Sequence, residues 1–349
     1  MPDLLQTLRA SLAAATLLGA SVAALAAGYR LSDLGTLPHG DLSRATAIGP
    51  DGRVYGQSSD APQTYQMRPV AFHGGAVRRL LRGTEAARAV GTAVAVDAQG
   101  AIAGTLSLDH GPVAYRLHGA VLEQLAPRQG WAIALGMSPG GLVVGQARLD
   151  GESMTGFQWG GGAPVALPGP VPTRASAALG AQDGGLVVGW ADLSGGPQAR
   201  RVAYAWRDGV PVGELPGLGG HWSEATAVNV HGAVVGHSTL TDRYDRHAFL
   251  YQDGHLLDLD GDPASISEAW AINGRGEVVG WRARGGRTAA FLYRQGRMQR
   301  LDALLPAAQR AVWTVDRAHA IDDQGRIVGE AIHPTLGRHA VLLTPVQPR

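Results

Sequence analysis

The sequence predicts an all-β fold, a seven-bladed β-propeller of four-stranded antiparallel blades that is closed by the N-terminal strand completing the last blade. Three observations predict this fold: a repeat marked by a glycine, short apolar runs bounded by turn residues within each repeat, and a last repeat that lacks its fourth strand. Runs of this kind, rich in β-branched and aromatic side chains, are typical of β-strands.

The repeat is easiest to follow from the glycine that ends its apolar second strand. The recurring line reads Ala-x-Ala-apolar, a polar or glycine turn, and then an apolar pair before this glycine; it is clearest over 225–236 and 269–280 and degenerate in the first four repeats. The repeat glycines are Gly56, Gly104, Gly145, Gly189, Gly236, Gly280 and Gly329. They are 48, 41, 44, 47, 44 and 49 residues apart, and a period of about 40–50 residues is the length of a propeller blade.

Each repeat has a second half, in which another apolar run is followed by a tight turn and a short strand. Ala248–Tyr251 followed by Leu256–Leu259 shows this pattern well. The unit therefore reads strand, tight turn, strand, long loop, strand, tight turn, strand. The predicted blade cores lie near 45–81, 92–125, 131–167, 175–215, 224–259, 268–301 and 317–343.

The two ends of the chain complement each other. The seventh repeat ends at the strand 339–343, with only a short tail, 346–349, beyond the predicted propeller of residues 27–345. Residues 29–37 have the fourth-strand pattern but no blade before them. We expect this closing strand to pair antiparallel with 339–343, because closure removes exposed edge strands that invite aggregation.

The first 26 residues resemble a signal peptide. The stretch from Ser11 to Ala27 carries no charge and is rich in Ala and Leu, and Ala24-Leu25-Ala26 offers small residues for cleavage after Ala26. We expect an exported protein, periplasmic or extracellular, with no membrane span in the mature chain. An uncleaved N-terminal anchor is the alternative.

The repeat motifs resemble those of a known family. His247-Ala248-Phe249-Leu250-Tyr251 is similar to the motif that names the HAF family of extracellular repeats. The segments 33–37 and 215–220 resemble its Asp-Leu-Gly-Thr-Leu-Gly-Gly segment. The resemblance covers roughly residues 29–345 and is sharpest in the fifth and sixth repeats. It implies an exported repeat protein and no particular reaction.

Composition excludes several kinds of chemistry. The net charge is +1, so nothing indicates a nucleic acid partner or an anionic membrane surface. Cysteine is absent, and all 30 basic residues counted as Lys or Arg are arginines. Thiol nucleophiles, disulfides, Schiff-base lysines and phosphate-loop lysines are therefore excluded. We expect no cofactor.

Two motifs match known functional sites only in part. Gly136-Met137-Ser138-Pro139-Gly140 matches Gly-x-Ser-x-Gly, but it falls in a hairpin turn, whereas a nucleophile elbow joins a strand to a helix. Asp258, Asp260 and Asp262 have the spacing of the start of a calcium loop, without the distal Glu such a loop requires. We expect solvated turn acids there, no metal site, and no catalytic set.

The histidines are scattered and show no metal-binding spacing. His247 and His339 occupy the same repeat position, so we expect a repeated structural hydrogen bond. Trp159 and Trp206 occupy the position of the tyrosines Tyr251 and Tyr293 in the third strand, which predicts blade core.

Five other tryptophans fall near one face of the predicted propeller. Trp131, Trp222 and Trp270 lie near the start of innermost strands, and Trp190 and Trp281 follow the repeat glycine. Both places border the face formed by the inter-blade connections, which carries the site in many propellers. Packing between blades is the alternative for each. The opposite face consists mainly of tight turns, which offer little side chain for recognition.

Charged residues gather at the same face. Arg44, Glu224, Glu268 and Arg317 each stand twelve residues before a repeat glycine, and would form part of a ring at the channel mouth. A solvated rim with local ion pairs is the alternative. The predicted ligand-binding residues are Arg44, Trp131, Trp190, Trp222, Glu224, Glu268, Trp281 and Arg317.

Three functions are compatible with these observations. The leading hypothesis is a monomeric binding or scaffolding module that holds a glycan or protein ligand against aromatic, Arg and Glu side chains. The opposing hypothesis is a hydrolase or lyase acting on polysaccharide, in which Glu224 and Glu268 supply the paired carboxylates of glycoside cleavage. A purely structural surface repeat is the third.

Overall fold

The computed structural model describes residues 28–81, 90–125, 130–149, 153–171, 174–194, 199–241, 243 and 245–346. The predicted signal peptide and residues 347–349 lie outside this range. Within it the chain is built from short β-strands, with one 3-10 turn, η3 (Asp302–Leu304), and one helical turn, α1 (Ala307–Arg310). None of the described helices is long and apolar enough to cross a membrane.

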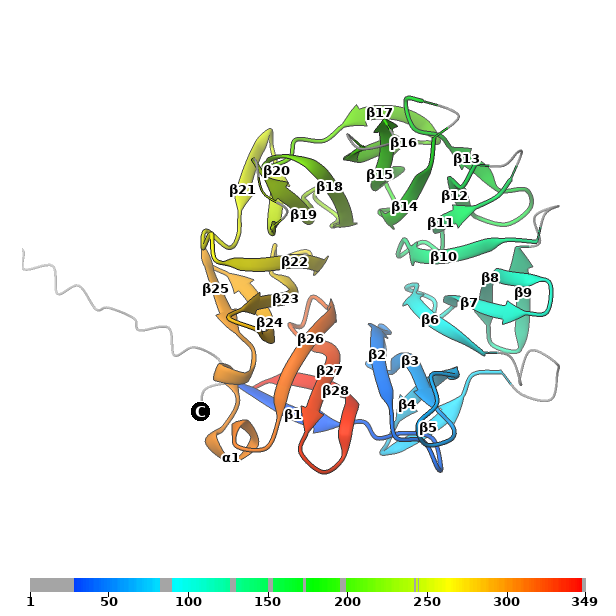
Figure 1. Ribbon diagram of the computed structural model, residues 1–349. Coiled ribbons are helices and arrows are strands. Elements are labelled where there is room, and N and C mark those ends of the chain that lie inside the picture. Colours follow the sequence, from blue (N-terminus) through cyan, green and yellow to red (C-terminus); the bar gives the residue numbers. More distant parts are fainter. Residues whose placement is uncertain are drawn as a thin grey trace, which may run out of the picture.

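The strands form antiparallel sheets arranged around a central axis, with the first strand of each repeat innermost (Figure 1). Five sheets are separate and have four strands each. Their strands are β2 (Ser43–Ile48), β3 (Val54–Ser59), β4 (Met67–His73) and β5 (Ala76–Arg79); β6 (Val90–Val96), β7 (Ile102–Leu108), β8 (Gly111–His118) and β9 (Val121–Leu125); β10 (Ala132–Met137), β11 (Val143–Ala147), β12 (Thr155–Trp159) and β13 (Val165–Leu167); β22 (Ser265–Ile272), β23 (Val278–Arg284), β24 (Arg287–Arg294) and β25 (Arg297–Arg300); and β26 (Thr314–Ile321), β27 (Ile327–His333), β28 (Gly337–Pro345) and β1 (Tyr29–Asp33).

The fourth and fifth repeats share one eight-stranded sheet, so five separate blades stand where seven were predicted. The cause is the length of β18, whose ten residues place Trp222 beside Arg201 of β16 in a single parallel pair. The strands of this sheet are β14 (Ser176–Ala181), β15 (Leu186–Ser194), β16 (Arg200–Arg207), β17 (Val210–Glu214), β18 (Gly219–Val228), β19 (Val234–Leu240), β20 (Arg246–Gln252) and β21 (His255–Asp258).

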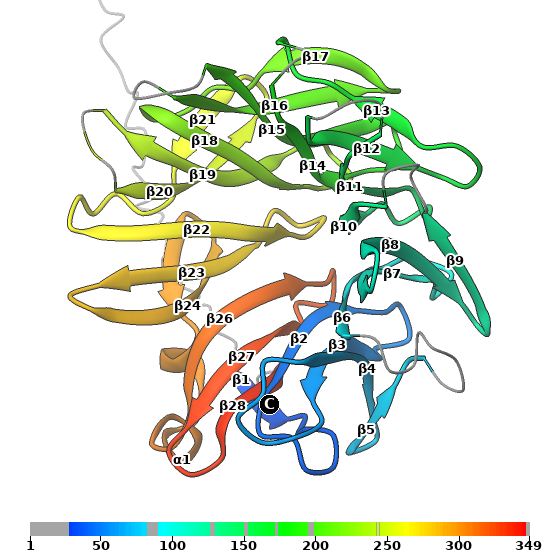
Figure 2. The ribbon, with the colours of Figure 1, turned by 45° about the vertical axis from the view of Figure 1, so that its right-hand side comes forward.

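The predicted antiparallel pairing of the two chain ends is confirmed. Strand β1 lies along β28, with Tyr29 opposite Pro345 and Asp33 opposite Val341 (Figure 1 and Figure 2). The strand is shorter than the predicted 29–37, because Asp33 accepts a hydrogen bond from the Gly35 N–H and Gly35 takes a positive φ of 71°, which turns the chain away.

A glutamine side chain covers the outer edge of β1. The Gln309 side chain, in α1, accepts a hydrogen bond from the Leu31 N–H at 2.9 Å and donates one to the Leu31 carbonyl at 2.7 Å. This amide therefore takes the place of a further strand and satisfies backbone groups that an edge would leave open.

The repeat glycine has the same physical cause in all seven repeats. A Cβ on it would lie 1.9 to 2.0 Å from the carbonyl oxygen of the residue twelve positions earlier, in the innermost strand. Next to this contact the innermost strand bulges by one residue, the x of Ala-x-Ala or, in the third and fourth repeats, of Ala-x-Gly. The bulged residues line a central cavity of about 290 Å³ and are Thr46, Val94, Leu135, Leu179, Thr226, Trp270 and His319.

The hydrophobic cores lie within and between neighbouring sheets. Trp159 and Trp206 are buried, and Tyr251 and Tyr293 pack against the cores while partly buried, which confirms the prediction for these four aromatics. Neighbouring sheets thus pack against each other around the axis, and this packing fixes the innermost strands beside the central channel.

Candidate functional site

Seven of the eight predicted ligand-binding residues belong to one polar and aromatic network on the predicted face. We call it the rim network. It runs from the fourth repeat through the seventh into the first as two clusters of hydrogen bonds, ion pairs and ring contacts, one around Arg201 and one around Glu268 and Glu330, with His237 between them. Its members are Arg44, Trp190, Asp192, Arg201, Trp222, Glu224, His237, Arg246, Glu268, Trp270, Trp281, Asp316, Arg317, His319, Glu330 and Arg338.

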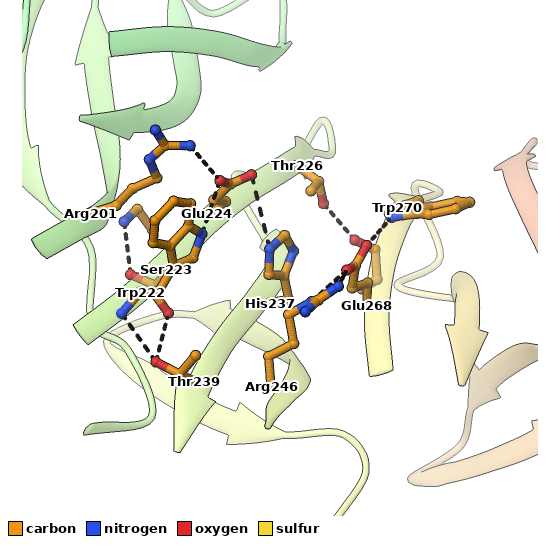
Figure 3. A network of polar contacts seen from close by, with 12 residues as sticks. Arg201, Trp222, Ser223, Glu224, Thr226, His237, Thr239, Arg246, Glu268 and Trp270 are labelled. Carbon is orange, nitrogen blue, oxygen red and sulfur yellow. Dashed lines mark hydrogen bonds and ion pairs between the residues drawn. The ribbon is translucent and has the colours of Figure 1, made fainter. Parts of the chain in front are cut away.

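Arg201 anchors one end of the network. Its guanidinium carbon lies 3.4 Å from the ring centroid of Trp190 and 4.2 Å from that of Trp222. The same guanidinium pairs with Asp192 at 2.7 Å. It also pairs with Glu224 at 3.0 Å (Figure 3). A guanidinium held by two carboxylates and two aromatic rings has a fixed position.

The two tryptophans beside Arg201 differ in exposure. Trp190 is 8% exposed, so its ring is buried. Trp222 is 38% exposed, although its indole N–H donates to Glu224 at 3.1 Å. Only Trp222 of this pair presents a ring to solvent.

The second carboxylate of the predicted ring, Glu268, lies in a similar setting one repeat later. Arg246 pairs with its Oε1 at 2.5 Å, and the indole N–H groups of Trp270 and Trp281 donate to its Oε2 at 2.9 and 3.1 Å. Burial alone would raise the pKa of Glu268, but His237, Arg246 and the two indole donors outweigh burial and lower it.

Arg201 and Arg246 follow a rule that sequence analysis missed. Each stands at the start of the third strand of its repeat, three residues before the residue opposite the repeat glycine. Each pairs with the glutamate in the innermost strand of the next repeat, Glu224 or Glu268. Arg338 has the same position in the seventh repeat, and because the next repeat carries Arg44 there, it pairs within its own repeat instead.

Glu330 is the most deeply buried charge of the network, with a side chain 1% exposed. It contacts Arg44 at 2.7 Å, His319 at 2.8 Å and Arg338 at 3.3 Å. Burial raises its pKa, but the His319 hydrogen bond and the two arginines prevail and hold the pKa at about 2. Glu330 therefore stays ionised, and the His319 Nε2–H donates to it.

His237 lies between the two predicted glutamates (Figure 3). It is 8% exposed, its Nε2 is 3.9 Å from Glu224 Oε2, and its Nδ1 has no hydrogen-bond partner among the described residues. Burial lowers the pKa of this imidazole, and the arginines Arg201 and Arg246 add to that effect against the two glutamates. The ring is neutral near pH 7. Its position, directly after a repeat glycine, was the sequence signal for it, as it is for Glu330.

The other predicted residues have distinct settings. Arg317 lies 5.7 and 5.9 Å from the ring centroids of Trp281 and Trp270, and Trp270 stacks on His319 at 4.8 Å. Trp131 is half-buried in the third repeat, outside the part of the ring that the rim network occupies. The predicted charged residues therefore occupy only part of the ring, from the fifth repeat through the seventh into the first.

The acids Asp258, Asp260 and Asp262 have protein partners. Asp258 pairs with His247 at 2.8 Å, and Arg282 lies 2.7 Å from Asp260 and 2.9 Å from Asp262. The expectation of solvated turn acids was wrong for Asp260, whose side chain is fully covered, and the other two carboxylates are only partly exposed.

Ser138 is buried in the turn between β10 and β11, where its hydroxyl accepts a hydrogen bond from the Leu142 N–H at 3.3 Å. The Gly-x-Ser-x-Gly match therefore lies in a hairpin turn, as expected. Among the residues that the structure describes, no three His, Cys, Asp or Glu side chains are placed to hold a metal ion.

The opposite face was predicted to consist mainly of tight turns, but it also holds a cavity of about 410 Å³ at its centre. Its polar lining residues serve the turns: Asn229 Oδ1 accepts the N–H groups of His231 and Ala233, and its Nδ2 donates to the Asn273 carbonyl. These side chains fasten one turn to the next.

No family model and no curated protein matches the chain. Solved structures do. The β-propeller domain of the Trilobed protease from Pyrococcus furiosus superposes with a TM-score of 0.60 at 11% identity, over 92% of this chain and 98% of that one. A puromycin-hydrolyzing peptidase from Mycobacterium tuberculosis does so with a TM-score of 0.55 at 15% identity, over 91% of this chain and 52% of that one. At such identities the likeness shows the fold alone, and the chain is an all-β propeller.

Proposed function

We propose that this propeller is a binding or scaffolding module that holds a glycan or protein ligand on the face carrying the rim network. The observation that carries the proposal is the exposed indole of Trp222, which lies over a guanidinium fixed by Asp192 and Glu224. Exposed Trp and Arg side chains held in place by neighbours are favoured at recognition surfaces.

The ionisation of Glu268 argues against this residue as the proton donor of a glycoside cleavage. A cleavage site with paired carboxylates needs one carboxylic acid whose pKa is raised, so that it can donate a proton. The pKa of Glu268 is lowered instead, because Arg246, His237 and two indole donors favour its ionised form. This carboxylate suits ion pairing better than proton transfer, which makes a hydrolase the second candidate.

A screen of the mature chain against glycans and extracellular proteins tests the proposal. We expect at least one ligand whose binding is weakened by Trp222→Ala and unaffected by Leu257→Ala, an exposed apolar residue on the outer strand β21. Cleavage of a bound polysaccharide that Glu268→Gln abolishes would instead favour the hydrolase.

We also propose that the eight-stranded sheet comprises two blades, giving the ring seven. Each half has its own repeat glycine, Gly189 or Gly236, with the same close approach to the innermost strand, and one residue pair joins the halves. Breaking that pair with Trp222→Pro should leave a folded ring if the halves are separate blades. A collapse of the melting transition would argue for one continuous sheet.

Export and membership of the HAF family remain our proposal from the motifs of the sequence. Mass spectrometry of the native protein should find an N-terminus near Ala27. An intact first segment on a cytosolic protein would contradict export.

A further inference from the structure

We infer that the rim network binds an uncharged, hydroxyl-rich ligand, a neutral glycan unit that stacks on Trp222 and hydrogen-bonds to His237. The inference rests on the proposed function and names its ligand class. Three independent features of the network support it. These are its charge balance, the His237 nitrogen without a hydrogen-bond partner, and the Trp222 ring that Arg201 covers only in part.

The charges of the rim network balance. It holds five arginines, Arg44, Arg201, Arg246, Arg317 and Arg338, against five carboxylates, Asp192, Glu224, Glu268, Asp316 and Glu330. Each of these ten groups has a partner of opposite sign within 4 Å. An acidic or basic ligand would add a net charge to a network whose own charges already cancel. An uncharged ligand can bind without breaking a pair.

His237 has a buried ring nitrogen whose hydrogen-bonding capacity the described residues leave unused. Buried polar groups are almost always hydrogen-bonded, and one without a partner costs free energy. The His237 Nδ1 has no partner among the described residues, and its Nε2 is too far from Glu224 for a hydrogen bond, at 3.9 Å. A neutral imidazole has one donor and one acceptor nitrogen, and a sugar hydroxyl can both donate and accept.

Trp222 offers the apolar contact. The Arg201 guanidinium lies 4.2 Å from the centroid of the Trp222 ring, and the Trp222 indole N–H donates to Glu224. Trp222 is nevertheless 38% exposed, so Arg201 covers it only in part. The negative face of an indole attracts the weakly positive C–H groups of a pyranose ring. Trp222 and His237 both belong to the fifth repeat, on the adjacent strands β18 and β19, where Glu224 contacts both.

The test measures binding of the mature chain to neutral polysaccharides, such as dextran and galactomannan, and to anionic ones, such as alginate and polygalacturonate, at low and high salt. We expect a neutral polysaccharide to bind with an affinity that changes less than about twofold with salt, because screening acts on charges. His237→Ala and Trp222→Ala should each weaken it about tenfold, the effect of losing one good contact. His231→Ala, an exposed histidine at the turn of the same blade, is the matched control and should bind like the wild type.

Melting curves of the variants separate lost contacts from lost folding. If His237→Ala does not fold, His237→Gln, which keeps a donor and an acceptor, should fold and retain binding. Binding only to anionic polysaccharides, falling steeply with salt, would overturn the inference and leave the binding function standing, as would binding only to a protein. Neutral-glycan binding that neither variant weakens would also overturn it. Binding to nothing in the wider screen would overturn the proposed function itself.

Discussion

The His339 Nδ1 lies 3.0 Å from Asp33 Oδ1, although 306 residues separate them in the chain. The contact joins β28 to β1. His247 and Asp258 repeat it between β20 and β21 at 2.8 Å, which confirms the predicted repeated hydrogen bond. In the fifth repeat this contact joins neighbouring strands of one hairpin, whereas in the last sheet it joins the two ends of the protein.

Replacing His339 by Ala should therefore destabilise the closure of the ring. Asp33 would keep its charge and lose its partner, which costs about 1–2 kcal/mol for a charged hydrogen bond that is partly exposed. Urea unfolding measures the loss, and limited proteolysis should show earlier cleavage near β1. His247→Ala, the equivalent change within one hairpin, should lower stability without exposing β1. Equal protection of β1 in both variants would contradict the role of His339 in closure.

Removing β1 entirely should have a larger effect. Deleting residues 1–38 exposes the edge of β28 and the core around it, including buried Leu343 and Val341, and leaves the Gln309 side chain without its Leu31 partner. We expect loss of solubility or a clear fall in melting temperature, because an unpaired strand edge promotes aggregation. Deleting residues 1–27, which leaves β1 intact, is the control. A melting curve shared by both truncations would mean that β1 contributes little.

The predictable part of the fold came from positions that the backbone dictates. The repeat glycine avoids a clash with the carbonyl twelve residues earlier, so it recurs wherever this strand pairing recurs. The position twelve residues before this glycine identified Glu224 and Glu268. The position directly after the glycine would have identified His237 and Glu330. Such positions can be aligned from sequence because no long loop lies between them.

The arginines of the site could not be found in the same way. Arg201 stands twelve residues after its repeat glycine and Arg246 only ten, and each pairs with a glutamate of the next repeat. Their roles depend on how neighbouring blades pack. The sequence also carried no sign of which tryptophan is exposed. Trp190 and Trp222 both contact Arg201, yet Trp190 is buried and Trp222 is exposed to solvent. The long β18, which joins the fourth and fifth repeats in one sheet, also left no signal that repeat spacing could reveal.

Acid should destabilise the protein through Glu330. Its pKa falls from 4.5 to about 2 on folding. A depressed carboxyl pKa contributes stability that is fully present above the unfolded value and is lost as pH falls from about 4.5 towards 2, here about 3 kcal/mol. Burial also lowers the pKa of His319, whose protonation at acid pH acts in the same direction.

The measurement is a series of melting temperatures between neutral and acid pH. Glu330→Gln should be less stable than the wild type at neutral pH, because Arg44 and Arg338 lose their buried partner. Its melting temperature should also fall less steeply between pH 4.5 and 2. Parallel curves for the two proteins would show that Glu330 does not carry the acid sensitivity.

Gly236→Ala tests the cause of the repeat. The added Cβ would lie 1.9 Å from the Glu224 carbonyl oxygen, which is backbone and cannot move aside as a flexible side chain would. We expect a loss of about 3 kcal/mol, at the upper end for overpacking. Gly160→Ala, where the nearest atom is a Leu142 methyl at 3.6 Å, is the control and should be close to neutral. Wild-type stability in Gly236→Ala would show that the strands can separate freely at this point.

Trp190 and Trp222 make a matched pair for separating stability from binding, because both rings contact the same guanidinium of Arg201. Trp190→Ala removes a buried ring and should cost about 3–5 kcal/mol, as large-to-small aromatic changes in a core do. Trp222→Ala removes a ring that is 38% exposed and should cost much less stability. Its effect should appear in ligand affinity, since the Arg201 guanidinium keeps Asp192 and Glu224 as partners. Thermal melting and binding measured side by side on the two variants decide the matter. A Trp222→Ala protein that is strongly destabilised but binds normally would place this ring in the structure and remove it from the site.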